Sequence, residues 1–308
     1  MMEAMNPKEY LLSTLTKAGG EEDLIASPQF TIAVLQKYDF QFKKQFGQNF
    51  LVDLHVLGKI LRAAEIGSED VCLEIGPGIG SLTQLMGEAA KRVISVEIDN
   101  RLIPLLEENL AAYDNIEIVN SDFMELDLPT FFEEKAIDRP VKVVANLPYY
   151  ITTPIIMGLF ESGVPLDSIT VMVQEEVAKR MQAKPGTKDY GALSLAVQYY
   201  AEPTIAAYVP QNCFIPRPGV GSAVIHLKRR RELPVETKDE KLMFKLIRAA
   251  FGQRRKTLVN SVSGSPELTV SKDQILAALA KAGISEKIRG EALSLADFAK
   301  LADALGDL

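Results

Sequence analysis

Between residues 70 and 175 the apolar positions form five short, nearly continuous runs that are typical of buried β-strands. The runs are Val71–Ile75, Arg92–Glu97, Ile116–Asn120, Val141–Ala145 and Ile169–Gln174. The stretches between them carry amphipathic helical spacing, for example at Ser81–Ala90, Arg101–Ala112 and Pro154–Glu161. Because strands that alternate with helices form βαβ units, the pattern predicts an α/β fold around a buried parallel sheet. Two later runs, Ile205–Val209 and Ala223–Leu227, predict an antiparallel edge.

The pattern changes at both ends of this central region. Residues 1–40 have the spacing of a short helical extension, interrupted at Gly19–Gly20 and Pro28. After Arg231 the helical stretches Asp239–Phe251, Asp273–Ala282 and Leu295–Leu305 are separated by Ser, Gly and Pro. We therefore expect an N-terminal extension over 1–40, a main domain over 41–231 and a small helical domain over 232–308.

The composition is that of an ordinary globular chain, with 308 residues of which 47% are hydrophobic and 24% charged. No apolar run reaches the roughly 18 residues that a membrane-spanning helix needs, and the first ten residues lack the apolar core of a signal peptide. Two cysteines, Cys72 and Cys213, and two histidines are too few for a disulfide framework or a typical zinc site. We expect a soluble, cytoplasmic protein with no metal and no membrane contact.

The net charge is −7, which argues against a partner as anionic as nucleic acid. The segment Lys228–Lys256 is instead basic, with eleven basic and four acidic residues, so the rest of the chain carries a net charge of −14. Such a local excess indicates either a surface for an anionic partner or a solvated helix face.

A glycine-rich turn comes after the first strand, in Glu74-Ile-Gly76-Pro-Gly78-Ile-Gly80, directly before a helix. Glycines let the backbone turn sharply and approach a ligand closely. The G-x-G-x-G spacing differs from the dinucleotide fingerprint, and Pro77 removes one backbone donor. The turn therefore favours a ligand with a ribose and without pyrophosphate, although a plain tight turn would use the same residues.

Acidic residues stand at the carboxyl ends of three successive predicted strands, at Glu74, Glu97 and Asp122. Ligands bind at that edge of open parallel sheets. Glu97 is placed to accept hydrogen bonds from ribose hydroxyls, and Asp122 from an adenine amino group. An acidic lining also suits a sulfonium cation, so the set resembles the S-adenosylmethionine (SAM) site of class I methyltransferases.

The fourth strand ends in Asn146-Leu147-Pro148-Tyr149. Adenine N6 is a poor nucleophile because its lone pair is delocalised into the ring. The Asn146 side-chain oxygen and the Leu147 carbonyl would accept its two N–H groups, and Tyr149 would stack on the extruded base. An N-x-P turn without chemistry is the alternative. No covalent nucleophile is needed, and we expect Cys213 to be a plain thiol.

Five motifs, in this order, resemble those of the KsgA (RsmA) family of 16S rRNA adenine dimethyltransferases. They are Gln45–Leu51 (QFGQNFL), Glu74–Gly78 (EIGPG), Asn146–Tyr149 (NLPY), Phe214–Pro218 (FIPRP) with Ser222, and Phe251–Lys256 (FGQRRK). The resemblance, which runs from about Lys43 to the end, implies a Rossmann-like SAM-dependent methyltransferase domain followed by an all-helical domain. It also implies N6,N6-dimethylation of two adjacent adenosines in a hairpin loop near the 3′ end of small-subunit rRNA, within an assembling 30S particle.

The resemblance further implies roles for individual residues. The residues that would contact SAM are Asn49, Leu51, Gly76, Gly78, Glu97, Asp122 and Asn146. The catalytic group would be Asn146, Leu147, Pro148 and Tyr149, with Phe214 on the far side of the target base. Tyr150 stands where the family often has Asn, a departure that could alter how the base is held. The extension has no assigned function, and we expect a monomer.

The basic segment then has a plausible partner. Lys228, Arg229, Arg230 and Arg231, together with Arg254, Arg255 and Lys256, would hold rRNA phosphates without reading sequence. The alternative is ion pairing with acidic parts of the same protein.

Three other functions remain open. A 23S rRNA adenine methyltransferase of the antibiotic-resistance (Erm) type shares the SAM and NLPY motifs, but such enzymes look more basic. A ribosome-assembly factor without turnover would not need Glu97, Asp122, Asn146 and Tyr149 together. A nicotinamide enzyme is disfavoured by the glycine spacing.

Overall fold

A computed structural model of the chain describes residues 5–307 except 16, 19, 41 and 43–46. Gln45 and Phe46 of the QFGQNFL motif, and the expected domain start at Gln41, lie outside the described residues. The chain forms two compact units, each of which is described by itself. The first comprises Met1–Ala178 and Thr204–Arg229, and the second comprises Lys179–Pro203 and Arg230–Leu308.

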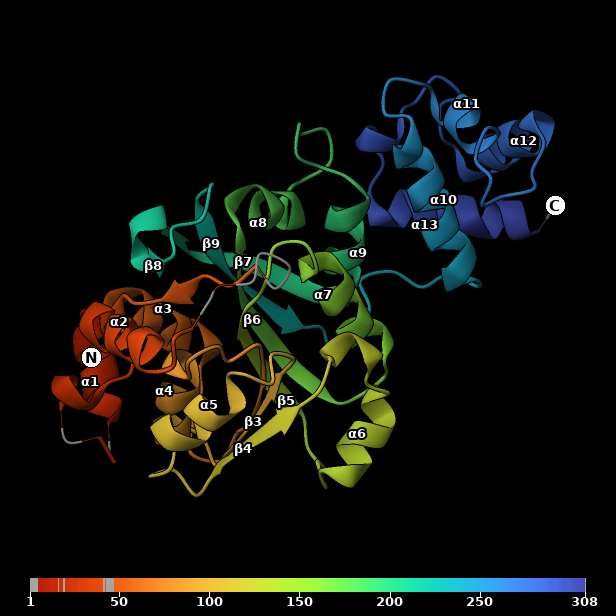
Figure 1. Ribbon diagram of the computed structural model, residues 1–308. Helices are drawn as coiled ribbons and strands as arrows, with labels where there is room; N and C mark the ends of the chain where they lie inside the picture. Colours follow the sequence, from red (N-terminus) through yellow and green to blue (C-terminus); the bar gives the residue numbers. More distant parts are fainter. Residues whose placement is uncertain (1–4, 16, 19, 41, 43–46, 308) are drawn as a thin grey trace. The chain divides into compact units, whose positions relative to one another are not determined.

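The first unit is built on a seven-stranded sheet in the order β4-β3-β2-β5-β6-β9-β7 (Figure 1). Its strands are β2 (Val71–Ile75), β3 (Arg92–Glu97), β4 (Ile116–Asn120), β5 (Val141–Asn146), β6 (Leu166–Gln174), β7 (Ala201–Val209) and β9 (Ser222–Arg229). The pairs from β4 through β6 are parallel, and β9 pairs antiparallel with β6. The predicted parallel sheet with an antiparallel edge is confirmed.

A second, two-stranded sheet joins distant parts of the first unit. β1 (Phe50–Leu51) pairs antiparallel with β8 (Phe214–Ile215), so that Leu51 lies opposite Phe214. Two residues are too few to give an alternating pattern, and the sequence therefore did not predict this pairing. It fixes the segment after Gly47 to a loop that lies far along the chain.

Helices and short 3₁₀ turns complete both units. Those of the first unit are α1 (Pro7–Thr14), η2 (Glu21–Asp23), α2 (Pro28–Lys37), α3 (Leu54–Ala64), α4 (Ser81–Ala89), α5 (Ile103–Asn109), η4 (Phe123–Glu125), α6 (Leu128–Glu134), α7 (Thr152–Glu161) and η5 (Gln211–Cys213). α8 (Glu175–Gln182) runs from the first unit into the second. The second unit holds α9 (Ala192–Tyr200), α10 (Glu240–Gly252), α11 (Leu258–Val262), α12 (Lys272–Ala282), η6 (Gly290–Ala292) and α13 (Leu295–Gly306).

The second unit differs from the expected boundaries in one respect. The break at Arg229 lies two residues from the expected one, but Lys179–Pro203 packs with the C-terminal helices. The Tyr190 hydroxyl donates to the Leu293 carbonyl at 2.8 Å, and its ring meets Phe251 edge-on. Tyr199 also stands edge-on to Phe244. These buried aromatic contacts explain why the segment belongs to the helical unit.

The core on one face of the main sheet joins α3 and α4 to the strands. Cys72, Val93, Val144, Met172 and Val224 are fully buried there, on five neighbouring strands. A second apolar cluster joins α5 to Phe50 and Ile79, beside the carboxyl ends of the strands. Both clusters include buried side chains of the N-terminal extension, which are Leu11, Leu24, Ile25, Ala26 and Val34. The extension is therefore an integral part of the first unit.

Helix α1 docks on α3 through close backbone contact. A Cβ atom at Gly58 would lie only 2.0 Å from the Pro7 carbonyl oxygen, so α3 accepts α1 only because residue 58 has no side chain. Arg62, one turn further along α3, donates to the Met5 carbonyl at 2.7 Å and lies over the Tyr10 ring. The two helices thus meet through hydrogen bonding as well as apolar packing.

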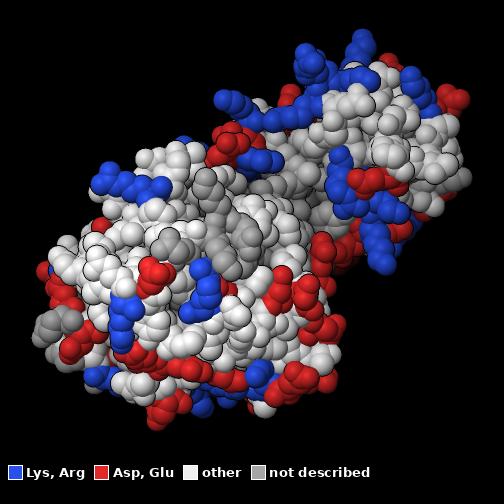
Figure 2. Space-filling model, in the orientation of Figure 1, with Lys and Arg blue, Asp and Glu red and all other residues white. Residues whose placement is uncertain are grey.

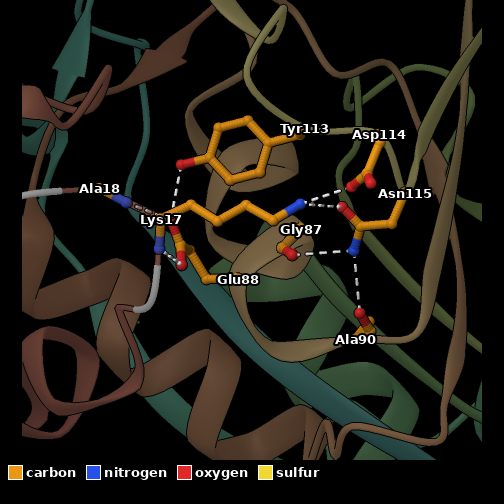
Figure 3. Close-up of polar contacts among 8 residues, drawn as sticks. All are labelled: Lys17, Ala18, Gly87, Glu88, Ala90, Tyr113, Asp114 and Asn115. Carbon is orange, nitrogen blue, oxygen red and sulfur yellow. Dashed lines mark hydrogen bonds and ion pairs between the residues drawn. The ribbon is translucent and has the colours of Figure 1, made fainter.

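A nearly buried carboxylate fastens the loop after α1 (Figure 3). Glu88 accepts the backbone N–H groups of Lys17 and Ala18, each at 2.8 Å, and the Tyr113 hydroxyl at 2.6 Å. Lys17 extends past this group to Asp114, whose side chain is 94% exposed. Hydrogen bonds to a buried carboxylate are stronger than those between neutral groups, so Glu88 is one of the polar anchors of the extension.

We predict that Glu88→Gln loosens the extension. The amide would replace one acceptor oxygen with a donor that faces a backbone N–H, at a cost of about 1–3 kcal/mol. Hydrogen–deuterium exchange of the peptide around Lys17 and Ala18 should then accelerate by about tenfold or more. Asp114→Asn, which alters the exposed neighbouring ion pair, should leave the exchange rate nearly unchanged. Equal exchange in all three proteins would contradict the role given to Glu88.

Candidate functional site

A pocket of the first unit lies at the carboxyl ends of β2, β3 and β5. Four segments line it: Gly47–Leu51, the turn from Gly76 into α4, Glu97–Ile98 and Asn146–Tyr149. Its space of about 830 Å³ is partly open to solvent. The last three segments come together because the parallel strands β2, β3 and β5 end at one edge of the sheet, whereas Gly47–Leu51 reaches the pocket from β1.

The glycine-rich turn leaves room where a ligand would lie. Gly76 has a φ of 69°, and a Cβ there would find no protein atom within 4 Å, so it would project into open space. Gly78, with a φ of 62°, lies against the Phe50 ring, which a Cβ would approach to 2.9 Å. Both positions need glycine. At Gly76 a side chain would enter the space left for a ligand, and at Gly78 it would clash with the Phe50 ring that packs on the turn.

Glu97 is the buried acid of the pocket, with 4% of its surface exposed. It accepts hydrogen bonds from the backbone N–H groups of Asp99 at 2.8 Å and Gly78 at 3.2 Å. Burial nevertheless dominates and raises the pKa of Glu97 to about 7. The carboxylate is thus held in place by the backbone. A ligand that donates hydrogen bonds or carries positive charge would stabilise its ionised form.

Glu74 has a structural function that the sequence did not reveal. Its carboxylate is almost fully buried and accepts the Thr83 hydroxyl at 2.6 Å and the Ser95 hydroxyl at 2.7 Å. Burial raises its pKa to about 7 as well. Glu74 therefore ties the first turn of α4 to β3 at the pocket, which it also lines, and so fixes the glycine-rich turn that joins β2 to α4.

The NLPY tetrapeptide leaves β5 with its asparagine fixed. The Asn146 Nδ2 donates to the Asn49 carbonyl at 2.8 Å, and the Asn49 side chain donates to the Gly47 carbonyl at 2.9 Å. The Asn146 Oδ1 is then the atom available to accept a hydrogen bond from a ligand. Leu147 is buried, and Leu51 lines the pocket beside it.

Tyr149 is positioned by Ser222, the serine that the sequence associates with the FIPRP motif. The two hydroxyls are 2.7 Å apart, and Ser222 is fully buried at the start of β9. Burial raises the pKa of Tyr149, so the phenol stays neutral. One face of the pocket mouth is therefore an aromatic ring with a fixed orientation. Next to it, Tyr150 is 60% exposed.

Two predicted site residues lie outside this pocket. Asp122 is half-buried at the end of β4, where its carboxylate accepts the Met124 backbone N–H at 2.9 Å. Phe214 is only 2% exposed and packs in the apolar core of the first unit. Their predicted roles at the adenine and at the target base stay predictions. Cys213 is likewise buried, which raises the pKa of its thiol to about 11 and fits a plain structural cysteine.

The predicted RNA-contacting residues divide between the units. Lys228 pairs with Asp167 at 2.9 Å, Arg230 with Glu202 at 2.7 Å, and Arg254 with Glu291 at 3.3 Å. Arg229 lies over the Phe160 ring. Three remain without an ion pair to any described residue: Arg231, Arg255 and Lys256. In Figure 2, Lys and Arg side chains gather on the visible face of the helical unit.

One polar pair beside the pocket, Gln48 and Asp99, was not predicted from the sequence. Gln48 donates through Nε2 to the buried Asp99 carboxylate at 2.9 Å, although 51 residues separate them. The only signal was an acid two residues after Glu97. Among the described residues no cluster of three or more His, Cys, Asp or Glu is placed to hold a metal ion. No helix in the described part of the chain is long and apolar enough to cross a membrane.

This chain is similar in sequence to a set of proteins with a common name. Proteins named ribosomal RNA small subunit methyltransferase A are similar over nearly their whole length. That of Lachnoclostridium phytofermentans is 59% identical over 92% of this chain and 98% of its own. That of Clostridioides difficile is 49% identical over 92% and 97%.

Solved structures show the same fold. A dimethyladenosine transferase from Plasmodium falciparum is 28% identical, with a TM-score of 0.68 over 82% of this chain and 95% of that one. The 23S rRNA methyltransferase ErmE is also 28% identical, with a TM-score of 0.63 over 84% and 100%. The predicted Rossmann-like methyltransferase fold is thereby confirmed.

The model of one protein family, described as ribosomal RNA adenine dimethylase, matches residues 39–307. The resemblance that the motifs predicted is therefore confirmed. The chain belongs to the ribosomal RNA adenine dimethylases, enzymes that transfer methyl groups from S-adenosyl-L-methionine to rRNA.

Proposed function

We propose that this enzyme forms N6,N6-dimethyladenosine at two adjacent adenosines in the hairpin loop near the 3′ end of 16S rRNA. The acceptor is the assembling 30S particle in the cytoplasm, and the enzyme acts as a monomer. The observation that carries the proposal is the fixed Asn146 amide, whose oxygen is available at the same pocket as the glycine-rich turn and Glu97. The names of the relatives that are 49–59% identical support the small-subunit acceptor.

The residues of the pocket fit S-adenosyl-L-methionine. The open space above Gly76 suits the methionine part, and the buried Glu97 suits the ribose hydroxyls. Gly78, Asn49 and Leu51 would complete the site, with Asp122 at the adenine. The bound cofactor supplies the methyl group. Two carboxylates, Glu74 and Glu97, lie at the pocket and favour a ligand with positive charge.

The chemistry of this chain's own residues concerns the acceptor amine. The Asn146 Oδ1 and the Leu147 carbonyl accept the two N–H groups of adenine N6, which turns the nitrogen lone pair out of the ring system. These dipoles also stabilise the positive charge that grows on nitrogen, and they are already oriented before reaction. Pro148 fixes the backbone at the exit of β5. The proton that N6 loses leaves to solvent.

The base is held by aromatic stacking in this proposal. Tyr149, whose hydroxyl is fixed by Ser222, offers one ring face to an adenine that has left its stack. Phe214 would approach the other face. Because Phe214 is buried at 2% exposure, it would have to move outward for this contact.

A 23S rRNA acceptor is the second candidate, because ErmE is as similar in sequence as the Plasmodium dimethyladenosine transferase. The proposal favours the small subunit since the relatives with that name share about half or more of their residues with this chain. A binding factor without turnover is disfavoured by the complete set of polar groups at the pocket.

We predict methyl transfer from labelled SAM to 30S subunits that lack the modification. Mass analysis of digested rRNA should find dimethyladenosine there and none in 50S or fully modified 30S subunits. Asn146→Ala should lower kcat/KM by about 10²–10³ because preoriented acceptors are lost from the transition state. Asn260→Ala, an exposed asparagine of the helical unit, is the matched control and should retain full activity.

The outcomes separate the candidates. Label in 23S rRNA would assign the resistance-type activity. No label in any subunit, with 30S binding intact, would support the assembly factor. An Asn146→Ala enzyme as fast as the wild type would refute the role of the tetrapeptide.

A second prediction concerns pH. Glu97 has a pKa of about 7 in the free protein, and only its ionised form accepts hydrogen bonds from both ribose hydroxyls. The Kd for SAM should therefore fall by about tenfold between pH 6 and pH 8 and level off above. Glu97→Gln should bind more weakly and lose most of this dependence. Glu74→Gln serves as the control, because Glu74 titrates in the same range but is occupied by Thr83 and Ser95. An unchanged pH profile in Glu97→Gln would exclude Glu97 as the group responsible.

A third prediction concerns the basic residues. Arg255 and Lys256 have no ion pair with described residues, so their charges are available for rRNA phosphates. Reversing Arg254 and Arg255 to Glu should weaken 30S binding and reduce the slope of log K against log salt concentration by about one to two. The exposed Lys272→Glu, which also reverses a charge in the helical unit, is the control. A slope that stays constant in the double variant would contradict the contact with rRNA phosphates. The role of Arg254 would then be its structural ion pair with Glu291.

A further inference from the structure

Asp99 is a buried acid for which neither the motifs nor the proposed chemistry accounts. It stands two residues after β3, and only 1% of its surface is exposed. Its backbone N–H donates to the Glu97 Oε1 at 2.8 Å. Arg101 donates from Nε to Oδ1 at 2.8 Å and from its terminal nitrogen to Oδ2. These bonds lower the pKa of Asp99, so that it stays ionised.

The same carboxylate holds the opposite rim of the pocket. Gln48 Nε2 donates to the Asp99 Oδ2 at 2.9 Å. The next residue, Asn49, presents the carbonyl that fixes the Asn146 side chain. A displacement of Gln48 would therefore move the group that orients the Asn146 amide, and it would also move a lining segment of the pocket itself.

A third connection leads from Asp99 to the N-terminal extension. The Arg101 guanidinium, held by Asp99, lies over the Phe40 ring at 4.7 Å from its centre. Phe40 comes after α2, and its ring is 6.0 Å from that of Phe50. Phe50 in turn lines the pocket against Gly78. The extension thus reaches the pocket wall through one cation–π contact and one ring contact.

We propose that Asp99 is a positioning residue for SAM binding: through Gln48 it fixes the Gly47–Leu51 wall against Glu97, and through Arg101 it couples that wall to the extension. The inference rests on the proposed function, since it assigns the pocket to SAM. It gives the Asp99–Arg101 pair and Phe40 a role in the site although none of the three lines the pocket.

The geometry favours positioning over a purely structural role. A carboxylate that only stabilised the fold would not need partners at the pocket. The partners of Asp99 lead to two sides of it: its own backbone N–H to Glu97, and Gln48 and Arg101 to the Gly47–Leu51 wall. Ligand-binding groups must be held close to their productive places by a supporting layer of hydrogen bonds. Asp99 supplies that layer for both walls at the β3 edge.

A double-mutant cycle tests the coupling. Asp99→Asn keeps the size of the side chain but removes its charge, and Gln48→Met removes the donor at similar length. Gln48→Met should raise the Kd for SAM, measured by calorimetry, by about tenfold, because one charge-assisted hydrogen bond is lost. Asp99→Asn should raise it by at least as much, because the bonds from both Gln48 and Arg101 are weakened. The double variant should bind SAM no more weakly than Asp99→Asn alone, since Gln48 acts through Asp99. The KM for SAM in rRNA methylation should rise by the same factor.

Glu117→Gln is the matched control. Glu117 also holds two cations, Arg92 at 2.7 Å and Lys135, but it lies near the start of β4. It should lower thermal stability, because two ion pairs are lost, and leave the Kd for SAM within twofold of the wild type. This contrast separates loss of positioning from general loss of stability.

The results distinguish this inference from the proposed function. A wild-type protein that does not bind SAM would overturn both. Normal wild-type binding with an unchanged Kd in Asp99→Asn would overturn the positioning role alone. So would additive effects of the two substitutions, because Asp99 would then act without Gln48.

Discussion

The parallel pairing of β2 with both β3 and β5 is the constraint on which the rest of the structure depends. It brings the ends of three strands, and with them Glu74, Glu97 and Asn146, to one edge of the sheet. Side chains alternate between the faces of a strand, so a slip of one residue would send each of these groups to the other face. The buried apolar residues of five strands prevent such a slip. The relative positions of these three groups are therefore fixed, because the core beneath the sheet allows only one strand register.

The sheet edge supplies only half of the pocket. The other half is the segment from Gly47 to Leu51, which the chain holds by pairing β1 with β8 and by hydrogen bonds to Asn146 and Asp99. Phe50 then closes on a glycine that has no side chain to oppose it. Local backbone geometry and long-range pairing thus depend on each other, and the pocket exists only when both are formed.

Periodicity and short motifs were sufficient to predict the local features of this chain. The strands from Val71 to Gln174, the glycine-rich turn and the positions of Glu97 and Asn146 are all set by local pattern. Contacts that tertiary packing alone decides could not be predicted in this way. Glu74 faces Thr83 and Ser95 rather than serving only as a pocket acid. Helix α9, within Lys179–Pro203, belongs to the helical unit, which no local pattern in the sequence indicated. The Gln48–Asp99 bond joins residues that no motif links.

The contact between Pro7 and Gly58 has a consequence for substitutions in α3. Helix α1 can pack this closely on α3 only because residue 58 is glycine. A side chain at this position would meet the Pro7 backbone and push α1 away from α3. A single position in the middle of α3 thus decides whether a distant N-terminal segment can dock.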